Sequence, residues 1–167
     1  MARTIHNNGC VLEEQPEIGV AAALSLLGAV VDEAVLDALD GTGLRRAHGY
    51  LVQRLLLGPA TATDMADDLG VSQQWVSKAL KELVALGHVE VLAAGADRRR
   101  RPAALTASGR EAVRTARATR ASIDARLRAA VGPDRFDATR AVLLAALDAL
   151  GAGERVRRRS VRPPATG

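Results

Sequence analysis

Aromatic residues are almost absent from this chain, which has one Trp, one Tyr and one Phe among its 167 residues. Any hydrophobic core must therefore be built from aliphatic side chains, chiefly Leu, Val and Ala. The apolar share of 48% is enough to bury such a core in a chain of about one domain's length. The composition thus predicts a small globular protein with aliphatic packing.

Cysteine is equally scarce, because Cys10 is the only one in the chain. A single thiol forms no internal disulfide, which is typical of a reducing compartment, and we expect the protein to be cytoplasmic. No base adjoins Cys10 in the sequence to activate it as a redox sensor, and a lone thiol is usually inert.

Motifs for catalysis are also missing. The sequence has no Gly-rich phosphate loop, no Ser elbow and no paired carboxylates in a recognisable frame. Its three histidines, His6, His48 and His88, lack the spacing of metal ligands. We therefore expect no enzyme activity, no metal and no cofactor.

No apolar run is long enough to cross a membrane. The run over residues 18–31 holds fourteen residues with only Ser25 polar, whereas a bilayer span needs about 20. A helix that is apolar on nearly every side must be covered, and in so small a chain a second subunit would cover it. Residues 136–150 have the same character. The two segments together predict a homodimerisation bundle.

Charge is distributed unevenly along the chain, although the net charge is only +4. Residues 1–40 contain one Arg against seven acidic residues, whereas residues 154–167 contain five Arg against one Glu. Such a protein has an oriented electric field that steers its basic side toward polyanions.

The stretch 61–106 carries the most informative pattern. A short helix is predicted over residues 62–69, because its apolar residues fall on one face. Gly70 tolerates the positive φ of a tight turn, and Ser72 is a natural N-cap for a second helix that runs to Leu86. The apolar stripe of this second helix consists of Val76, Ala79, Leu80, Leu83 and Leu86. Its other side is polar, which suits contact with the major groove of DNA.

A hairpin is predicted to follow. Residues 88–92 read as a half-buried strand, residues 95–97 as its turn and residues 102–105 as the returning strand. Four arginines crowd the tip, and a narrow minor groove has the negative potential to hold one or two of them. Helix, turn, helix and hairpin in this order predict a winged helix-turn-helix.

Ten residues are the predicted DNA contacts: Ser72, Gln73, Gln74, Ser77, Lys78, Lys81, Arg98, Arg99, Arg100 and Arg101. A merely solvated helix face and a merely charged loop are the alternatives for the two groups. The hairpin beside the helix favours DNA contact, with Arg99 as the leading single candidate.

The same stretch resembles the MarR-type transcriptional regulators. Their wing reads Asp-x-Arg followed by Leu-Thr-x-x-Gly, and this chain has Asp97, Arg99 and then residues 105–109 as Leu-Thr-Ala-Ser-Gly. The segment 70–78 and the Leu-x-x-x-Gly ending at Gly87 also resemble the family, whereas Trp75 departs from it because a small polar residue is usual there. The resemblance covers about residues 44–113.

The resemblance implies a mainly α fold with a small β wing, in which N- and C-terminal helices form the dimerisation bundle. It implies a homodimeric repressor of a palindromic operator in double-stranded DNA, released by a small aromatic or phenolic effector. His48 and Tyr50 lie where relatives hold such effectors, although core packing is the favoured explanation for both residues. The alternatives are a winged-helix protein-interaction module and a sequence-tolerant chromosome-binding protein.

The expected organisation has five segments. Residues 1–16 form an N-terminal arm, residues 17–43 and 107–151 the helical dimerisation region, residues 44–106 the winged helix-turn-helix, and residues 152–167 a disordered basic tail. Within the winged helix-turn-helix, residues 44–57 are expected to be a helix with Leu44, Ala47, Leu51 and Leu55 inward.

Overall fold

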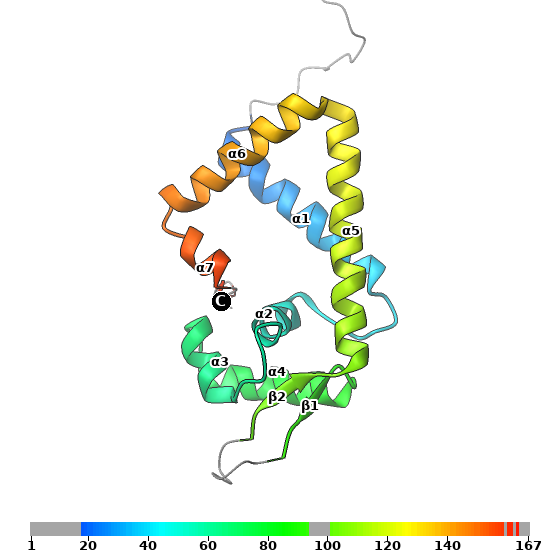
Figure 1. The fold of residues 1–167 in the computed structure, drawn as a ribbon, viewed down its shortest axis with the longest axis vertical. Helices are drawn as coiled ribbons and strands as arrows, with labels where there is room; N and C mark the ends of the chain where they lie inside the picture. Colours follow the sequence, from blue (N-terminus) through cyan, green and yellow to red (C-terminus); the bar gives the residue numbers. More distant parts are fainter. Residues whose placement is uncertain (1–17, 94–100, 159, 162, 164–167) are drawn as a thin grey trace, which may run out of the picture.

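The protein is described here by a computed structural model that covers residues 18–93, 101–158, 160–161 and 163. Figure 1 shows a mainly helical chain with one small hairpin. The elements are α1 (Val20–Ala38), α2 (Arg46–Leu55), α3 (Ala62–Leu69), α4 (Gln73–Ala85), β1 (Val89–Val91), β2 (Ala103–Leu105), α5 (Ala107–Val131), α6 (Pro133–Ala149) and α7 (Gly153–Arg157). The predicted fold class is confirmed.

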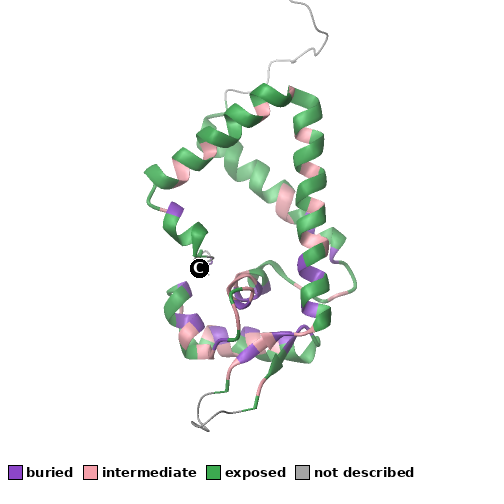
Figure 2. Cartoon of the chain, viewed as in Figure 1, coloured by how far each residue is buried: buried purple, intermediate pink, exposed green. Residues whose placement is uncertain are grey.

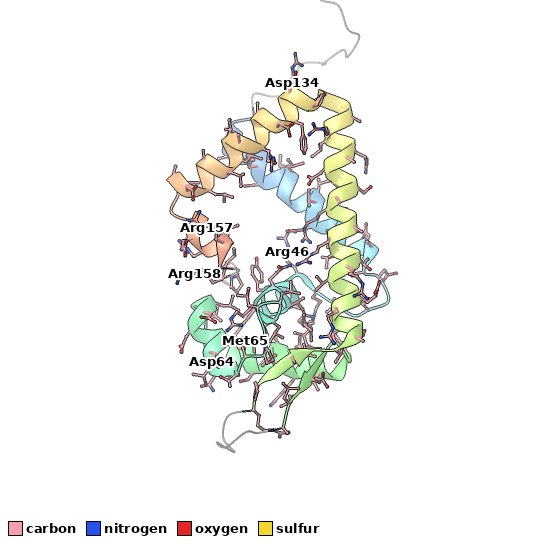
Figure 3. All side chains as sticks on the ribbon, in the orientation of Figure 1. Arg46, Asp64, Met65, Asp134, Arg157 and Arg158 are labelled. Carbon is pink, nitrogen blue, oxygen red and sulfur yellow. The ribbon has the colours of Figure 1, made fainter. Side chains whose placement is uncertain are left out.

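The lower part of the molecule, formed by α2, α3, α4 and the β1–β2 hairpin, is called the head below (Figure 1). Its strands are antiparallel with Val89 opposite Leu105, and Ala60 adds a bridge to Ala103. The head has one aliphatic core, and the side chains at its centre are fully buried. These central residues include Leu51, Met65, Leu69, Val76 and Leu83. The side chain of Met65 lies between α3 and α2 in Figure 3.

The upper part is built differently. The 25-residue α5 rises from the hairpin, α1 packs along its lower half, and α6 turns back from its upper end (Figure 1). Arg128 of α5 fixes this upper corner, because it pairs with Asp137 and its guanidinium lies 5.6 Å from the ring centre of Phe136. Figure 2 shows α6 and the first half of α1 mostly exposed, whereas the second half of α1 is partly covered and contains the buried Val35. No residue of α6 is buried in the described chain.

Two sequence expectations for the helices are wrong. Helix α2 begins at Arg46, two residues later than expected, and Ala47 is exposed because it faces away from the head core. Residues 153–157 form α7, so the expected irregular tail is not irregular over these five residues. Ion pairs from Glu154 to Arg157 and Arg158 span one turn of α7 and stabilise it locally.

No helix in the described parts of the chain is both long enough and apolar enough to span a bilayer.

Candidate nucleic-acid interface

The turn between α3 and α4 is fixed by local chemistry. Gly70 ends α3 with φ 62° and ψ 40°, a left-handed conformation that glycine adopts without steric cost. Ser72 then caps α4, because its hydroxyl accepts a hydrogen bond from the Trp75 N–H at 3.2 Å. The sequence predicted both features. They set the direction in which α4 leaves the turn.

Helix α4 has one buried and one exposed side, as predicted. Its buried residues are Val76, Ala79 and Leu83. The exposed side carries Gln74, Lys78 and Lys81, with Ser77 partly covered. These four positions follow the i, i+3, i+4, i+7 spacing of a single helix face. The structure therefore gathers four of the predicted contact residues on one solvent-facing surface, called the α4 front below.

Gln73 lies at the first turn of α4 and is exposed, but its side chain is already engaged. Its amide nitrogen donates a hydrogen bond to Thr63 Oγ1 of α3 at 3.2 Å. Thr63 could not be predicted as a partner from the sequence, because the two residues lie ten positions apart on different helices. Gln73 thus ties the two helices of the motif together at their exposed edge.

The departure from the family pattern at Trp75 has a structural explanation. Its side chain is half-buried and packs against the head core, as the side chains of Val71 and Leu80 also do. The large ring at this position therefore packs α4 against the edge of the head core.

The hairpin continues beyond its named strands, because Leu92 N donates to the Pro102 carbonyl at 2.8 Å. Arg101, at the described end of this hairpin, is exposed. Arg98, Arg99 and Arg100 lie outside the described residues, as does Cys10. Figure 1 shows the hairpin projecting from the head below α4.

A buried histidine lies behind α4. His48 of α2 is 1% exposed, and its Nδ1 accepts a hydrogen bond from the Arg45 backbone N–H at 3.2 Å. Because a backbone N–H can only donate, the ring proton of neutral His48 lies on Nε2, which donates to Glu82 Oε2 of α4 at 2.9 Å. Arg45 pairs with the same carboxylate oxygen.

These contacts change the acidity of Glu82. The His48 hydrogen bond, aided by the charge of Arg45, holds the pKa of this carboxyl below its ordinary value, while partial burial opposes the shift. Glu82 thus stays ionised at neutral pH. Sequence reasoning missed this residue, because its partners lie 34 and 37 positions away.

A second buried histidine, His88, lies just beyond α4. Its Nε2 donates to the Thr42 carbonyl at 3.0 Å, and its Nδ1 accepts from the Ser108 hydroxyl at 3.0 Å. Gly109 lies against the His88 backbone so closely that a Cβ would not fit there. His88 therefore joins the α1–α2 connector, the hairpin and the start of α5 at one point.

Two cavities lie between the head and the helices above it. One, of about 100 Å³, is lined by His48 together with Val35 of α1 and Ala112 of α5. The other, of about 540 Å³, is lined by Tyr50 and by Val156 and Arg157 of α7. Their shared lining residues are Asp32, Arg46, Gly49, Gln53 and Arg120. His48 and Tyr50 thus line two adjoining cavities and do not share one.

Arg46 lines both cavities. It pairs with Asp32 of α1, and Figure 3 shows it in the space between the head and α1, with Arg157 on α7 opposite. The part of the chain that the structure describes contains no cluster of three His, Cys, Asp or Glu residues suited to a metal ion.

The two helices joined at Gly70 and the hairpin after α4 together define a winged helix-turn-helix protein. A family model described as MarR family matches residues 42–100, which run from the α1–α2 connector into the hairpin. This segment is therefore similar to the MarR family, as the sequence resemblance predicted. No curated protein matches the chain.

Solved structures share the fold over most of the chain. A crystal structure of RV1404 from Mycobacterium tuberculosis matches with a TM-score of 0.66 and 22% identity, covering 82% of this chain and 98% of that one. The S. aureus MepR–DNA complex matches with a TM-score of 0.63 and 18% identity, over 78% of this chain and 98% of MepR. S. aureus MepR bound to ethidium bromide matches with a TM-score of 0.58 and 18% identity, over 81% and 99%.

Proposed function

We propose that this chain is a sequence-specific regulator of transcription that binds double-stranded DNA. The observation that carries the proposal is the α4 front, a polar helix surface beside a projecting hairpin, supported from behind by a complete core. An α-helix fits the major groove, where glutamine pairs with adenine and lysine meets guanine or phosphate. The similarity to MepR, whose structure includes DNA, supports the same use.

Each predicted contact residue has a role in this proposal. Gln74 and Gln73 read base edges, although Gln73 must first release Thr63. Lys78 and Lys81 meet guanine or phosphate, and Ser77 lies between them. Ser72 orients the first turn, since its hydroxyl is occupied by capping. The four arginines Arg98, Arg99, Arg100 and Arg101 enter the minor groove or contact its phosphates.

The functional unit in this proposal is a homodimer. Val20 is 78% exposed and Leu27 43% exposed on α1, while Val142 is 65% and Leu150 81% exposed at α6 and its end. Exposed apolar surface on this scale marks an interaction site, and a second copy offers the same surfaces. Two-fold symmetry would place the two α4 helices about 34 to 36 Å apart, on a palindromic operator. Occupying a promoter in this way would repress it.

The cavity beside Tyr50 is the proposed effector site. Its volume of about 540 Å³ lies within the range of small-molecule sites, about 300 to 1,000 Å³. The phenol ring of Tyr50 and the nearby guanidinium groups suit a small aromatic or phenolic compound. Since both ring nitrogens of His48 are bonded within the protein, His48 serves as wall rather than as a polar contact. A thermal-shift screen of phenols tests the site, with Tyr50→Ala as the variant that should lose the response.

In this proposal the regulator acts in the cytoplasm, where it reaches its operator DNA, and its function requires no enzyme activity.

DNA binding measured against rising salt tests the proposal most simply. Lys81→Ala should lower the slope of log affinity against log salt by about 1, because one phosphate contact is lost. Arg135→Ala is the matched control, since it removes an exposed positive charge from α6, far from the α4 front. An equal effect of both variants would contradict the placement of Lys81.

The wing is tested by Arg99→Ala. Loss of one good base-edge contact should weaken binding by about 1 to 3 kcal/mol. Unchanged affinity would show that the wing assignment is wrong.

The alternative functions predict other results. A specific regulator should prefer its own site by at least about 10³ over random DNA. Equal affinity for both would indicate a sequence-tolerant chromosome-binding protein. A flat response to salt would indicate a protein-interaction module.

A further inference from the structure

Two kinds of contact hold α4 in the head, and they constrain it differently. The apolar contacts of Val76, Ala79 and Leu83 press the helix onto the core. Apolar attraction has no preferred direction, so it resists removal of the helix more than rotation about its axis. Hydrogen bonds are directional and weaken steeply when bent. The rotation of α4 is therefore most sensitive to its polar anchors.

Glu82 is such an anchor. It lies one turn after Lys78 and next to Lys81, at the edge of the α4 front, and its side chain is 31% exposed. One carboxylate oxygen receives both the His48 Nε2–H and the Arg45 guanidinium. Both donors belong to the N-terminus of α2. This anchor thus fixes the α4 front relative to α2.

His48 is held in turn by the backbone of α2. Its Nδ1 accepts the Arg45 N–H, and its own backbone N–H donates to the Arg45 carbonyl at 2.9 Å. The ring is nearly inaccessible to solvent and lies in the wall of the smaller cavity. It can therefore transmit the position of α2 to Glu82 with little freedom of its own.

We propose that His48 is the positioning residue for the α4 front, setting through Glu82 the angle at which α4 meets the bases. The inference rests on the proposed DNA-binding function and adds to it the residue on which base discrimination depends. Base-edge hydrogen bonds require placement within about 0.5 Å and 10 to 20°, whereas phosphate contacts by flexible lysines tolerate more. Loss of the anchor should thus reduce discrimination more than general affinity.

Two amide substitutions separate the two nitrogens of the ring. His48→Gln places an amide nitrogen near the position of Nε2 and keeps a donor for Glu82. His48→Asn places an amide oxygen near the position of Nδ1 and keeps an acceptor for Arg45, but it loses the donor to Glu82. Both variants remove the ring and leave the charge of neutral His48 unchanged, so they form a matched pair.

The experiment uses the full-length protein and two duplexes: one selected by the wild type from a random-sequence pool, and a scrambled duplex of the same length and composition. The readout is the ratio of the two affinities, with the melting temperature measured in parallel. His48→Asn should lower the ratio by about tenfold, the effect of losing one charge-assisted hydrogen bond. His48→Gln should keep the ratio within about twofold of the wild type.

A ratio that is unchanged in His48→Asn, or reduced equally in both variants, would overturn the inference, because the ring would then act only as core packing. If the wild type selects no sequence, the proposed function fails and the inference fails with it. If neither variant folds, Glu82→Ala against Glu82→Gln decides the question, since Gln keeps an acceptor oxygen. The ratio should then fall in Glu82→Ala alone. The missing charge raises affinity for both duplexes alike and cancels from the ratio.

Discussion

The head and the helices above it differ in how they bury their apolar residues. In the head, Leu51, Met65, Val76 and Leu83 are fully buried by residues of the same chain. In α1 and α6, large aliphatic side chains remain open, with Val20 78% exposed. The head core is therefore complete within one chain, whereas the exposed apolar surfaces of α1 and α6 are the ones that the proposed homodimer would cover.

The cause of the difference is visible in the patterns of the helices. Helices α3 and α4 are apolar on one side only, so a small core satisfies them. The first part of α1 is apolar on nearly every side and is exposed, because α5 packs only against the second half of α1. Helices of the proposed DNA-binding part therefore have a polar side, whereas those of the proposed dimer interface lack one.

The largest effect is expected from a substitution in the exposed apolar surface of α6, which should prevent dimerisation. Leu144 is 53% exposed, and in a dimer it would be covered. Leu144→Glu would bury an unpaired charge twice per dimer, at about 3 to 5 kcal/mol each, and should raise the dissociation constant of the dimer by about 10⁴-fold or more. Sedimentation equilibrium measures this.

Thr139→Glu is the control for that substitution, because it introduces the same charge at an exposed polar position of the same helix. Dimerisation that survives Leu144→Glu, or is lost equally in both variants, would contradict the assignment of the α6 surface to the dimer.

A smaller effect is expected on the stability of the head, where a buried and an exposed leucine can be compared. Leu83→Ala should lower the free energy of unfolding by about 2 to 5 kcal/mol, because it opens a cavity at a fully buried position of α4. Leu57→Ala, at a position that is 57% exposed, should change it by less than about 0.5 kcal/mol. Urea denaturation compares the two. Similar losses would show that the head core is not complete as described.

The N-cap of α4 offers the next effect. Ser72→Ala should cost about 1 kcal/mol of stability, since the Trp75 N–H loses its acceptor. Ser72→Asp should preserve stability, because Asp is an equally good N-cap and its charge favours the N-terminus of a helix. The melting temperatures of the two variants should therefore separate. Equal losses would show that the hydroxyl does not cap the helix.

The smallest effect concerns acid stability. The pKa of Glu82 is lowered in the folded protein, so its ionised form stabilises the fold. This stabilisation is fully present at a pH above the ordinary pKa of 4.5, and it is lost as the pH falls through the folded pKa. Glu82→Gln should therefore lower the melting temperature at neutral pH and flatten its fall in acid. If the melting temperatures of both proteins fell in parallel between neutral and acid pH, the stabilising contact of Glu82 with His48 would be contradicted.

The parts of the structure that sequence reasoning predicted are those governed by neighbouring residues. The spacing of Ala62 and Leu69 defined α3, Gly70 gave the turn and Ser72 the cap, because each effect acts within one or two turns of chain. The hairpin strands followed from residues 88–92 and 102–105 for the same reason.

The parts that it missed depend on distant residues or on weak local effects. Glu82 reads as one more polar residue until α2 is placed behind it, and Thr63 as a solvated residue until Gln73 reaches it. Helix α7 is missed because five residues of Arg-rich sequence give no apolar period, although Glu154 pairs with two arginines one turn away. Ala47 was expected to point inward because it lies one turn before Leu51, but the buried face of α2 is formed by His48, Leu51, Val52 and Leu55.

The most direct test of the account is to repeat the sequence selection with Gln74→Ala. Gln74 lies on the α4 front and is exposed, and its loss leaves the head core and the charge unchanged. The account predicts that preference disappears at one base pair in each half of a symmetric site, by about 1 to 3 kcal/mol, and persists elsewhere. A selected sequence identical to that of the wild type would contradict the claim that the α4 front reads DNA.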